Sequence, residues 1–307
     1  MQNDLLELMI MDLMIQRLPG LKGNEKIELL KRFDREEDFS LLAKGGIEEI
    51  LGRSLENHSW SMDEIHNQAV RDAEAAKKLG IQMVSFRDEA YPPLLREIFD
   101  PPVLLFFRGK LPDPERPLVA IVGTRKPSSA AAARAYALGR QFAEAGIAVV
   151  SGLALGIDSL AHRGNVDGGA PTAAVLGSSP DMVYPASNRS LARRILETGG
   201  LILSEYPPGT GPMRWNFPER NRIISALARG VLIVEAPEKS GALITARFAL
   251  EQGRDLWMDA VGLKSPQGTG MQPFVEDGAK VVSAAEDILA EWNMISNVRN
   301  EQYGVKV

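Results

Sequence analysis

The sequence has no cysteine and only three histidines among its 307 residues. The absence of cysteine excludes disulfide bonds, thiolate zinc sites and a cysteine nucleophile. With so few histidines, a metal site built from several of them is not expected. The sequence also contains neither the GxGxxG fingerprint of dinucleotide-binding proteins nor the GxxxxGK[ST] phosphate loop. We therefore expect neither a bound metal nor a cofactor.

Long hydrophobic runs are missing as well. No stretch of 18 uncharged apolar residues occurs, and Met1 is not followed by the charged and then apolar pattern of a signal peptide. We therefore expect a cytoplasmic protein that does not insert into a membrane.

The overall composition is that of a soluble globular protein, with 45% apolar and 24% charged residues. The length predicts two domains. The net charge of −5 argues against a generally basic surface. A polyanionic partner would therefore have to be held by a local basic patch.

Residues 1–75 carry the periodicity of amphipathic helices and predict a small all-helical domain. The segments are LLELMIMDLMIQRL, NEKIELLKRF, IEEILGRSL and MDEIHNQAVRDAEAAKKLG. Between the first two, Leu18–Gly23 (LPGLKG) resembles the turn of a helix-hairpin-helix motif, whose backbone amides can hold a phosphate. Lys22 stands where that motif usually has glycine, and a plain interhelical turn is the alternative.

Residues 76–292 alternate short apolar runs with amphipathic segments, and residues 293–307 are expected to form a tail. Runs this apolar suit strands that are covered on both faces, so an α/β fold with a doubly wound, mostly parallel sheet is predicted. IQMVSF and VLLFFRG are expected to be flanking strands, and AKVVSAAEDILAEW a last strand and helix. The central runs lie at residues 118–123, 147–152, 172–177, 200–205, 230–236 and 255–260.

Glycine and polar residues gather after several of the predicted strands. In an open parallel sheet, ligands bind outside the carboxyl ends of the strands, near helix N-termini. Each loop has a simpler interpretation as a tight turn, with Asp158 as an N-cap and Arg125 as a solvated charge. The candidate residues are Gly123, Thr124, Arg125 and Lys126 after the first run, Gly152, Gly156 and Asp158 after the second, and Ser240 and Gly241 after the fifth.

A hydrolase triad of Ser151, Asp158 and His162 is a further reading of the second loop. Ser151, however, does not lie in a G-x-S-x-G elbow. His162 follows Asp158 by one helical turn and should not point back at Ser151. A triad is therefore not favoured.

Residues 215–227 (WNFPERNRIISAL) predict a helix with an unusual charge pattern. Asn216 and Glu219 have the spacing of a capping box, and the helix should end before Gly230. Helical spacing turns Arg220 or Asn221 toward the core. A buried arginine needs a carboxylate, for which Glu205 and Glu235 are candidates, or an anionic ligand.

Together, these loops resemble the DNA-processing protein A (DprA, also called Smf) family. The motifs that carry the resemblance are YPPLLREIFDPPVLLFFRG, VAIVGTRKPS, SGLALGIDSLAH, VLGSSPDMVYPASN, SEYPPGTGP, FPERNRIISAL and VEAPEKSGALITARFALEQGRDLW. The resemblance implies an extended Rossmann-like domain behind a helical domain similar to a sterile alpha motif. It further implies a homodimer that binds single-stranded DNA without hydrolysing it and loads the RecA recombinase during DNA uptake and natural transformation.

The resemblance assigns roles to particular residues of this chain. Arg125 in Gly-Thr-Arg matches the family's main DNA-contacting arginine, with Thr124 in place of the commoner serine. Lys239 matches a basic position that lines the same pocket. The second glycine loop matches at Gly152, Gly156 and Asp158, and the Phe-Pro-x-Arg-Asn-Arg motif at Phe217, Arg220, Asn221 and Arg222.

Two departures from the family pattern bear on these assignments. The sequence reads GMQPFVEDGA where the family usually has an asparagine followed by a Leu-Ile pair. It also ends soon after the last predicted helix, so the winged-helix domain of many members is not expected, and duplex binding is left without support.

The expected mechanism is binding of the DNA backbone, in which Arg125, Lys239 and the helix N-termini contact successive phosphates. Tyr206, Trp215 or Phe217 would offer a stacking face to a base. The alternative is a nucleotide-binding or nucleoside-monophosphate-hydrolysing protein of the Rossmann-like lysine-decarboxylase-like (LOG) group. That group has a Pro-Gly-Gly-x-Gly-Thr loop followed by a glutamate, whereas the sequence here reads EKSGALITARF.

Overall fold

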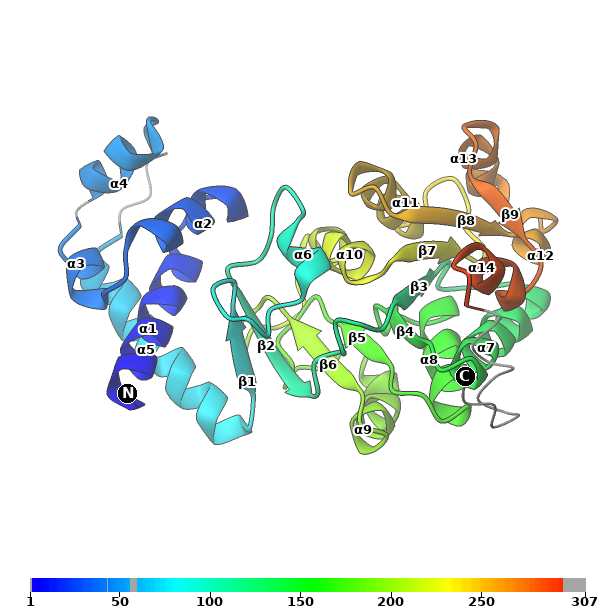
Figure 1. The fold of residues 1–307 in the computed structure, drawn as a ribbon, viewed down its shortest axis with the longest axis horizontal. Coiled ribbons are helices and arrows are strands. Elements are labelled where there is room, and N and C mark those ends of the chain that lie inside the picture. The colour runs from blue at the N-terminus through cyan, green and yellow to red at the C-terminus, as the bar shows by residue number, and fades with distance from the viewer. Residues whose placement is uncertain (1, 43, 56–59, 295–307) are drawn as a thin grey trace, which may run out of the picture. The chain divides into compact units, whose positions relative to one another are not determined.

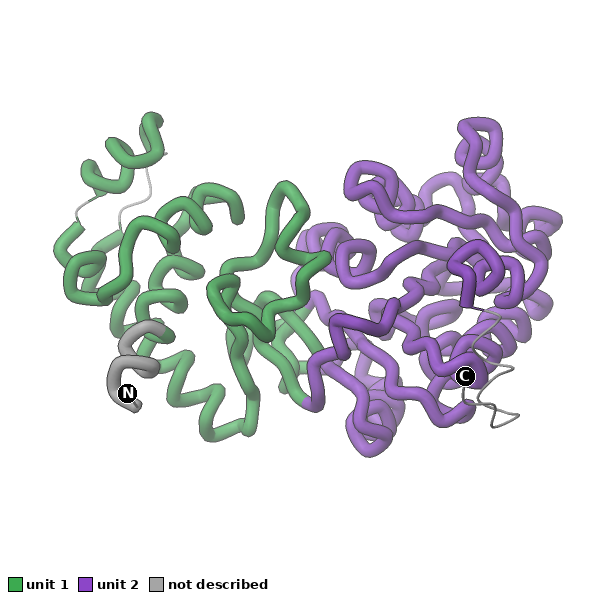
Figure 2. Tube along the Cα trace, viewed as in Figure 1, with its two compact units in different colours: residues 1–108, 178–182, 203–211 green, residues 109–177, 183–202, 212–307 purple. Residues whose placement is uncertain are grey.

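A computed structural model describes residues 2–42, 44–55 and 60–294 of the chain. Most of the predicted tail, from residue 295 onward, lies outside the described residues. The chain divides into two compact units, shown in separate colours in Figure 2. Unit 1 comprises residues 1–108, 178–182 and 203–211, and unit 2 comprises residues 109–177, 183–202 and 212–307.

Unit 1 begins with the predicted helices. They are α1 (Gln2–Arg17), α2 (Gly23–Arg32), α4 (Lys44–Leu51) and α5 (Met62–Leu79), with a short α3 (Glu36–Ser40) that the periodicity did not predict. The start and end of α5 follow from its sequence. Ser61 and Glu64 form a capping box, and Gly80 ends the helix with a φ of +63°.

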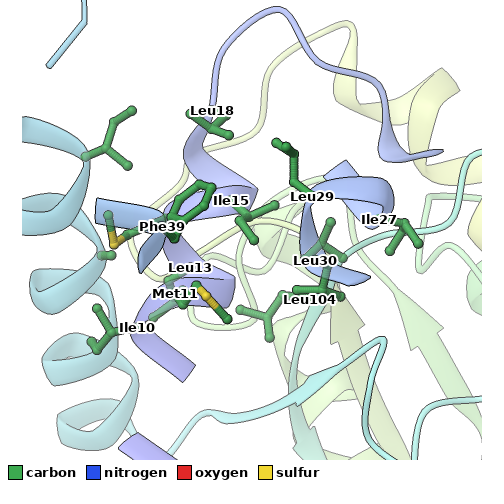
Figure 3. Close-up of a cluster of buried hydrophobic side chains, with 14 of the residues drawn as sticks. Ile10, Met11, Leu13, Ile15, Leu18, Ile27, Leu29, Leu30, Phe39 and Leu104 are labelled. Atoms are coloured by element: carbon green, nitrogen blue, oxygen red, sulfur yellow. The ribbon is translucent and has the colours of Figure 1, made fainter. Parts of the chain in front are cut away.

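The core of unit 1 is built by the apolar faces of these helices. Leu13 on α1, Leu29 on α2 and Phe39 on α3 are fully buried in one cluster, seen in Figure 3. Phe106 on β2 (Leu104–Gly109) joins the same cluster. This strand pairs antiparallel with β1 (Gln82–Ser85), and the short α6 (Pro93–Arg96) lies between them in sequence. Both flanking strands were predicted.

In the hairpin at residues 18–23, a backbone amide that could hold a phosphate instead bonds another part of the protein. The Gly23 N–H donates to the Asp100 carboxylate at 2.5 Å. A Cβ at Gly23 would lie 2.6 Å from that carboxylate oxygen, so only glycine allows the approach. The Gly20 carbonyl accepts a bond from the Arg53 guanidinium at 2.9 Å. We therefore interpret the hairpin as an interhelical turn that is tied to the rest of unit 1.

Replacing Asp100 with alanine is expected to lower the free energy of unfolding of unit 1 by about 1–2 kcal/mol, because the Gly23 N–H loses its acceptor. Hydrogen exchange measured by mass spectrometry should show faster exchange at the start of α2. The exposed Glu28 on the same helix supplies the control, since Glu28→Ala should leave that exchange unchanged. Unchanged protection of α2 in Asp100→Ala would contradict this account of the hairpin.

Unit 2 has the predicted doubly wound sheet, so the predicted α/β, mostly parallel fold is confirmed. Its strands run in the order β5-β4-β3-β7-β8-β9, and each neighbouring pair is parallel. All six central apolar runs form strands, and the predicted last strand is β9 (Lys280–Val282). The six are β3 (Leu118–Val122), β4 (Ala148–Ser151), β5 (Ala173–Val175), β6 (Leu201–Ser204), β7 (Gly230–Ile233) and β8 (Asp255–Asp259), of which β6 is divided between the two units.

Helices cover both faces of this sheet, as Figure 1 shows for α7 and α8 on one side and α10 and α11 on the other. Alternate residues of β3, Val119 and Ile121, pack in one cluster with α7, α8 and α14. No described helix is both long and apolar enough to cross a membrane. The helices are α7 (Ser129–Glu144), α8 (Ile157–Asp167), α9 (Arg189–Glu197), α10 (Asn216–Leu227), α11 (Ala242–Glu251), α12 (Ala260–Leu263), α13 (Gln272–Glu276) and α14 (Ala285–Glu291).

Candidate nucleic-acid interface

The crevice that a doubly wound sheet offers to ligands lies here between β3 and β7, where the winding reverses. From β3 the chain continues through α7 to β4, on one side of the crevice. From β7 it continues through α11 to β8, on the other side. A cavity of about 820 Å³ is lined by the β3–α7 loop, the start of α8, the first turns of α10 and the β7–α11 loop. Segments that are far apart in sequence thus meet at one cavity.

The β3–α7 loop brings Arg125 and Lys126 to the cavity, and both residues are exposed. The Thr124 N–H donates to the main-chain carbonyl of Glu235 at 2.7 Å, and the Thr124 hydroxyl accepts the Lys126 N–H at 3.3 Å. The Glu235 carboxylate accepts the N–H and the hydroxyl of Ser128 at 2.8 and 2.7 Å. The loop is therefore tied to the end of β7 at two points, which holds its two cations beside the cavity.

Two glycines allow the β3–α7 loop to pack against the β4–α8 loop. Gly156 has a φ of +79°, and a Cβ there would lie 2.4 Å from the Thr124 carbonyl oxygen. At Gly123, a Cβ would lie 2.6 Å from the Ile157 side chain. The Ile157 N–H also donates to the Thr124 carbonyl at 3.2 Å. A larger residue at either glycine would force the two loops apart.

Arg220 is the buried cation of the cavity lining, with 4% of the residue exposed. Its guanidinium donates to the Gly152 carbonyl at 2.8 Å and to the Val175 carbonyl. The Asp158 carboxylate accepts the Gly152 N–H at 3.1 Å. Burial raises the pKa of Asp158, and the positive charge of Arg220 opposes that shift. The protein itself therefore supplies the partners of Arg220.

One expectation for an acidic residue at this site is wrong. Asp158 is not an N-cap, because α8 begins at Ile157 after Gly156 and the Asp158 carboxylate bonds the preceding loop instead. The carboxylate of Glu235, a candidate partner for a buried arginine, accepts from Ser128. The other candidate carboxylate, at residue 205, belongs to unit 1.

The helix α10 has the predicted extent but not the predicted cap. The helix starts at Asn216, and the Asn216 side chain donates to the Gly177 carbonyl at 2.9 Å rather than capping the first turn. Gly230 is also not a helix-ending glycine: it opens β7, where a Cβ would lie 2.2 Å from Trp257. Asn216 and Gly230 therefore contact residues that are distant in sequence, and neither serves as a cap of α10.

Of the Arg-Asn-Arg triplet, two residues line the cavity and one does not. Arg220 and Asn221 are in the lining, whereas Arg222 is not. The Asn221 side chain donates to the Gly241 carbonyl at 3.1 Å, which joins α10 to the start of α11. The Arg222 guanidinium donates to the Glu219 carbonyl at 3.2 Å. The predicted DNA-contacting residue Arg222 is therefore outside the described lining of the cavity.

The β7–α11 loop contributes Lys239, Ser240 and Gly241 to the cavity. Lys239 is exposed. The Ser240 hydroxyl accepts the Ala242 N–H at 3.3 Å, and Gly241 is the N-cap of α11. The positive end of this helix therefore lies at the cavity beside a lysine.

Phe217 and Tyr184 form an aromatic pair at the cavity. Their ring centroids are 5.6 Å apart, and the Arg125 guanidinium carbon lies 5.6 Å from the centroid of Phe217. Tyr184 was not predicted as a site residue, although it lies in the VYP segment of a motif that carries the resemblance to the family. Of the other aromatic candidates, Trp215 is 62% exposed but outside the cavity lining, and Tyr206 belongs to unit 1.

The charges at the cavity favour an anion despite the net charge of −5. Among the residues that the structure describes, the lining holds a single carboxylate, that of Asp158, which is buried near Arg220. The exposed charged side chains of this described lining are all cations. These are Arg125, Lys126, Lys239 and Arg214, the last of which was not predicted.

The buried polar residues beside the cavity do not form a triad. The Ser151 hydroxyl donates to the Ile121 carbonyl at 2.6 Å. His162 Nδ1 lies 2.8 Å from the Thr172 hydroxyl, and burial lowers the pKa of His162 to about 3. Within residues 2–42, 44–55 and 60–294, no group of three or more acidic or histidine side chains is arranged to hold a metal.

Fold and site together define a Rossmann-like α/β protein with a cationic pocket at the switch point of its sheet. The sequence model of the DNA recombination-mediator protein A family matches residues 82–293. The chain therefore belongs to that family, in agreement with the resemblance seen in the sequence.

Individual relatives agree with this membership. DNA processing protein DprA of Streptococcus pneumoniae is 41% identical over 208 residues, which cover 68% of this chain and 73% of that protein. The X-ray structure of DNA processing protein A from S. pneumoniae matches with a TM-score of 0.74 and 34% identity, over 90% of this chain and 95% of that one. A structure that addresses the single-stranded DNA binding mode of the Helicobacter pylori protein matches with a TM-score of 0.62 and 29% identity, over 69% and 95%.

Proposed function

We propose that the chain binds single-stranded DNA with little sequence preference through the cavity between β3 and β7. The observation that carries this proposal is the cationic lining, in which Arg125, Lys126 and Lys239 lie at one cavity with the start of α11. Phosphates of a DNA strand are the ligands that such a lining favours. The H. pylori relative, whose single-stranded DNA binding mode has been described, supports the same choice of ligand.

Arg125 is the residue expected to contribute most to binding. It is exposed and belongs to a loop tied to β7, whereas Arg220 is buried and bonded to main-chain carbonyls. Family membership supports the further proposal that a homodimer of this protein acts in the cytoplasm during DNA uptake and natural transformation. There it would help to load the RecA recombinase onto the bound strand.

The alternative is hydrolysis or binding of nucleoside monophosphates in the same cavity. Hydrolysis would call for a carboxylate exposed to the ligand. The carboxylate of the described lining, Asp158, is buried and bonded to the Gly152 N–H. We therefore propose a DNA-binding role without catalysis. Release of free base from a nucleoside monophosphate by the purified protein, abolished in Arg220→Ala, would refute that choice.

A mobility shift tests the proposed ligand. Labelled single-stranded and duplex oligonucleotides of the same sequence are titrated with the wild-type chain and with Arg125→Glu. We expect the wild type to shift the single strand, and the affinity to fall steeply as salt is raised. Arg125→Glu should bind at least about tenfold more weakly, because one cationic phosphate contact becomes a repulsive one.

The controls for this experiment are chosen by position. Arg247 is an exposed arginine on α11 that does not line the cavity, so Arg247→Glu should bind like the wild type. Thermal unfolding of each variant should match the wild type. If the wild type shifts neither form of DNA at low salt, or if Arg125→Glu binds as well as the wild type, the site is wrongly assigned.

A further inference from the structure

The cavity between β3 and β7 continues into a smaller one that leads to the starts of α8 and α9. The smaller cavity holds about 40 Å³ and shares Arg125 and Tyr184 with the larger one. It is also lined by Leu155, two residues before α8, and by Pro185, four residues before α9. A strand that leaves the larger cavity on this side therefore meets the first turns of these two helices.

The helices α8 and α9 run side by side in the same direction. Near their starts, the Asn188 side chain donates to the Leu153 carbonyl at 2.9 Å, which joins the N-cap of α9 to the loop before α8. Near their ends, the Arg194 guanidinium donates to the Asp167 carboxylate at 2.5 Å. Both helices bury apolar side chains in one shared cluster. Their exposed side chains therefore form one continuous surface, the α8–α9 surface.

Three exposed arginines lie on the α8–α9 surface, namely Arg163 on α8 and Arg189 and Arg193 on α9. Arg189 and Arg193 are one helical turn apart and leave the same face of α9. Arg163 lies one turn before Asp167, which places it beside the middle of α9. Neither a hydrogen bond nor an ion pair joins any of the three guanidinium groups to another residue in the described part of the chain.

The exposed acids of the two helices lie at the ends that are farther from the cavity. Asp167 is the last residue of α8, and its bond to the Arg194 guanidinium holds its pKa below the usual range. Glu197 is the last residue of α9. Asp158, near the start of α8, is buried. From the starts of the two helices to their middles, the exposed charges are therefore all arginines, in a chain whose net charge is −5.

We propose that the α8–α9 surface is a second DNA-binding surface, on which Arg163, Arg189 and Arg193 bind phosphates of the strand after it leaves the cavity. The proposal rests on the proposed binding of single-stranded DNA and extends the bound length beyond the cavity. Arginines that have no partner within the protein are available to phosphate oxygens, and such contacts carry no sequence information. The surface thus fits the backbone of a strand of any sequence.

The length of the oligonucleotide separates the α8–α9 surface from the cavity. Fluorescence anisotropy is measured with labelled thymidine oligonucleotides of about 4 and about 16 nucleotides, the range of site sizes seen for single-strand binding folds. The triple variant Arg163→Gln/Arg189→Gln/Arg193→Gln should bind the longer strand at least about tenfold more weakly at low salt. Its slope of log affinity against log salt concentration should fall by up to about 2, since each phosphate contact contributes about 0.7. The shorter strand should bind as it does to the wild type.

The control is a triple variant with the same change of charge elsewhere in unit 2. Arg116, Arg140 and Arg247 are exposed and belong neither to the lining of the cavity nor to α8 and α9. Arg116→Gln/Arg140→Gln/Arg247→Gln should bind both strands like the wild type, and thermal unfolding of both triple variants should match it.

Three results would overturn the proposal while leaving the proposed function intact, provided that Arg125→Glu is weakened. The first is wild-type affinity of the α8–α9 variant for the longer strand. The second is an equal loss of affinity for both strands, and the third is an equal loss in the control variant. Failure of the wild type to bind either strand would instead overturn the proposed function itself.

A second measurement uses the unaltered chain. Exposed arginines are modified with phenylglyoxal in the presence and absence of each oligonucleotide, and the modified positions are identified by mass spectrometry. The longer strand should protect Arg163 and Arg193, the shorter strand should leave both reactive, and Arg247 should react equally throughout. Full reactivity of Arg163 and Arg193 under saturating long strand contradicts a DNA-binding role for this surface.

Discussion

Replacing Arg220 with methionine is expected to lower the free energy of unfolding of unit 2 by about 3–5 kcal/mol. Methionine keeps much of the length of the side chain but removes the charge. The buried carboxylate of Asp158 then loses its neighbouring cation, and the carbonyls of Gly152 and Val175 lose a donor. Urea unfolding measures the loss, and hydrogen exchange should locate it at the β4–α8 loop and α10.

The matched control is another arginine of the same cavity lining. Arg214 is exposed, so Arg214→Met should change the free energy of unfolding by no more than about 0.5 kcal/mol. Combining Arg220→Met with Asp158→Asn should recover part of the loss, because the second change removes the uncompensated charge. If Arg220→Met unfolds like the wild type but binds DNA poorly, Arg220 contacts the ligand and is not primarily structural.

Asp12 is expected to make the stability of unit 1 fall as the pH rises. Burial raises the pKa of Asp12 from 3.8 to about 6, while the Ser85 hydrogen bond and the Arg87 charge oppose the shift and the Asp88 charge adds to it. Arg87 lies 3.5 Å from the Asp12 carboxylate and 3.7 Å from that of Asp34. The carboxyl group is therefore buried in a cluster that holds two further acids.

The sign of the effect follows from proton binding. Below about pH 4, Asp12 is protonated in both the folded and unfolded chain. Between about pH 4 and 6, the unfolded chain loses the proton and the folded chain keeps it, so the free energy of unfolding falls as the pH rises. The full loss is about 3 kcal/mol, and it is present above about pH 6.

Asp12→Asn removes this titration. The free energy of unfolding of the variant, measured by urea titration at a series of pH values, should gain on that of the wild type by up to about 3 kcal/mol between pH 4 and 7. Asp38→Asn, at an exposed position of α3, should instead follow the wild-type pH profile. Parallel profiles for Asp12→Asn and the wild type would contradict the raised pKa.

The strands of unit 2 could be predicted because their signal is local. A strand covered by helices on both faces has to be apolar at consecutive positions, as residues 118–122 and 230–233 are in the structure. The loops that follow such strands necessarily lie at one edge of a parallel sheet. It could therefore be predicted from the sequence that Arg125 and Lys239 lie at the same cavity.

The tasks of the individual residues of α10 could not be predicted in the same way. Helical spacing relates Arg220 to Asn221 and Arg222, but it does not say which of them faces the cavity. The Asn216 side chain had a local use as a cap and a distant use at the Gly177 carbonyl, and the distant use is the one observed. The local pattern did not distinguish these alternatives, because a side-chain amide can accept a backbone N–H through its oxygen or donate to a carbonyl through its nitrogen.

The sequence by itself determined the order of the strands and of the longer helices, the glycine loops and the family. Only the tertiary structure decided that Asp158 lies near Arg220 and that Tyr184 lies beside Phe217, because each pair is joined by the fold and not by the chain. It likewise decided that Asp100 bonds the hairpin amide of Gly23. Apolar runs and turn residues act over a few positions, whereas a charge or a ring finds its partner wherever the packing of the core brings one within reach.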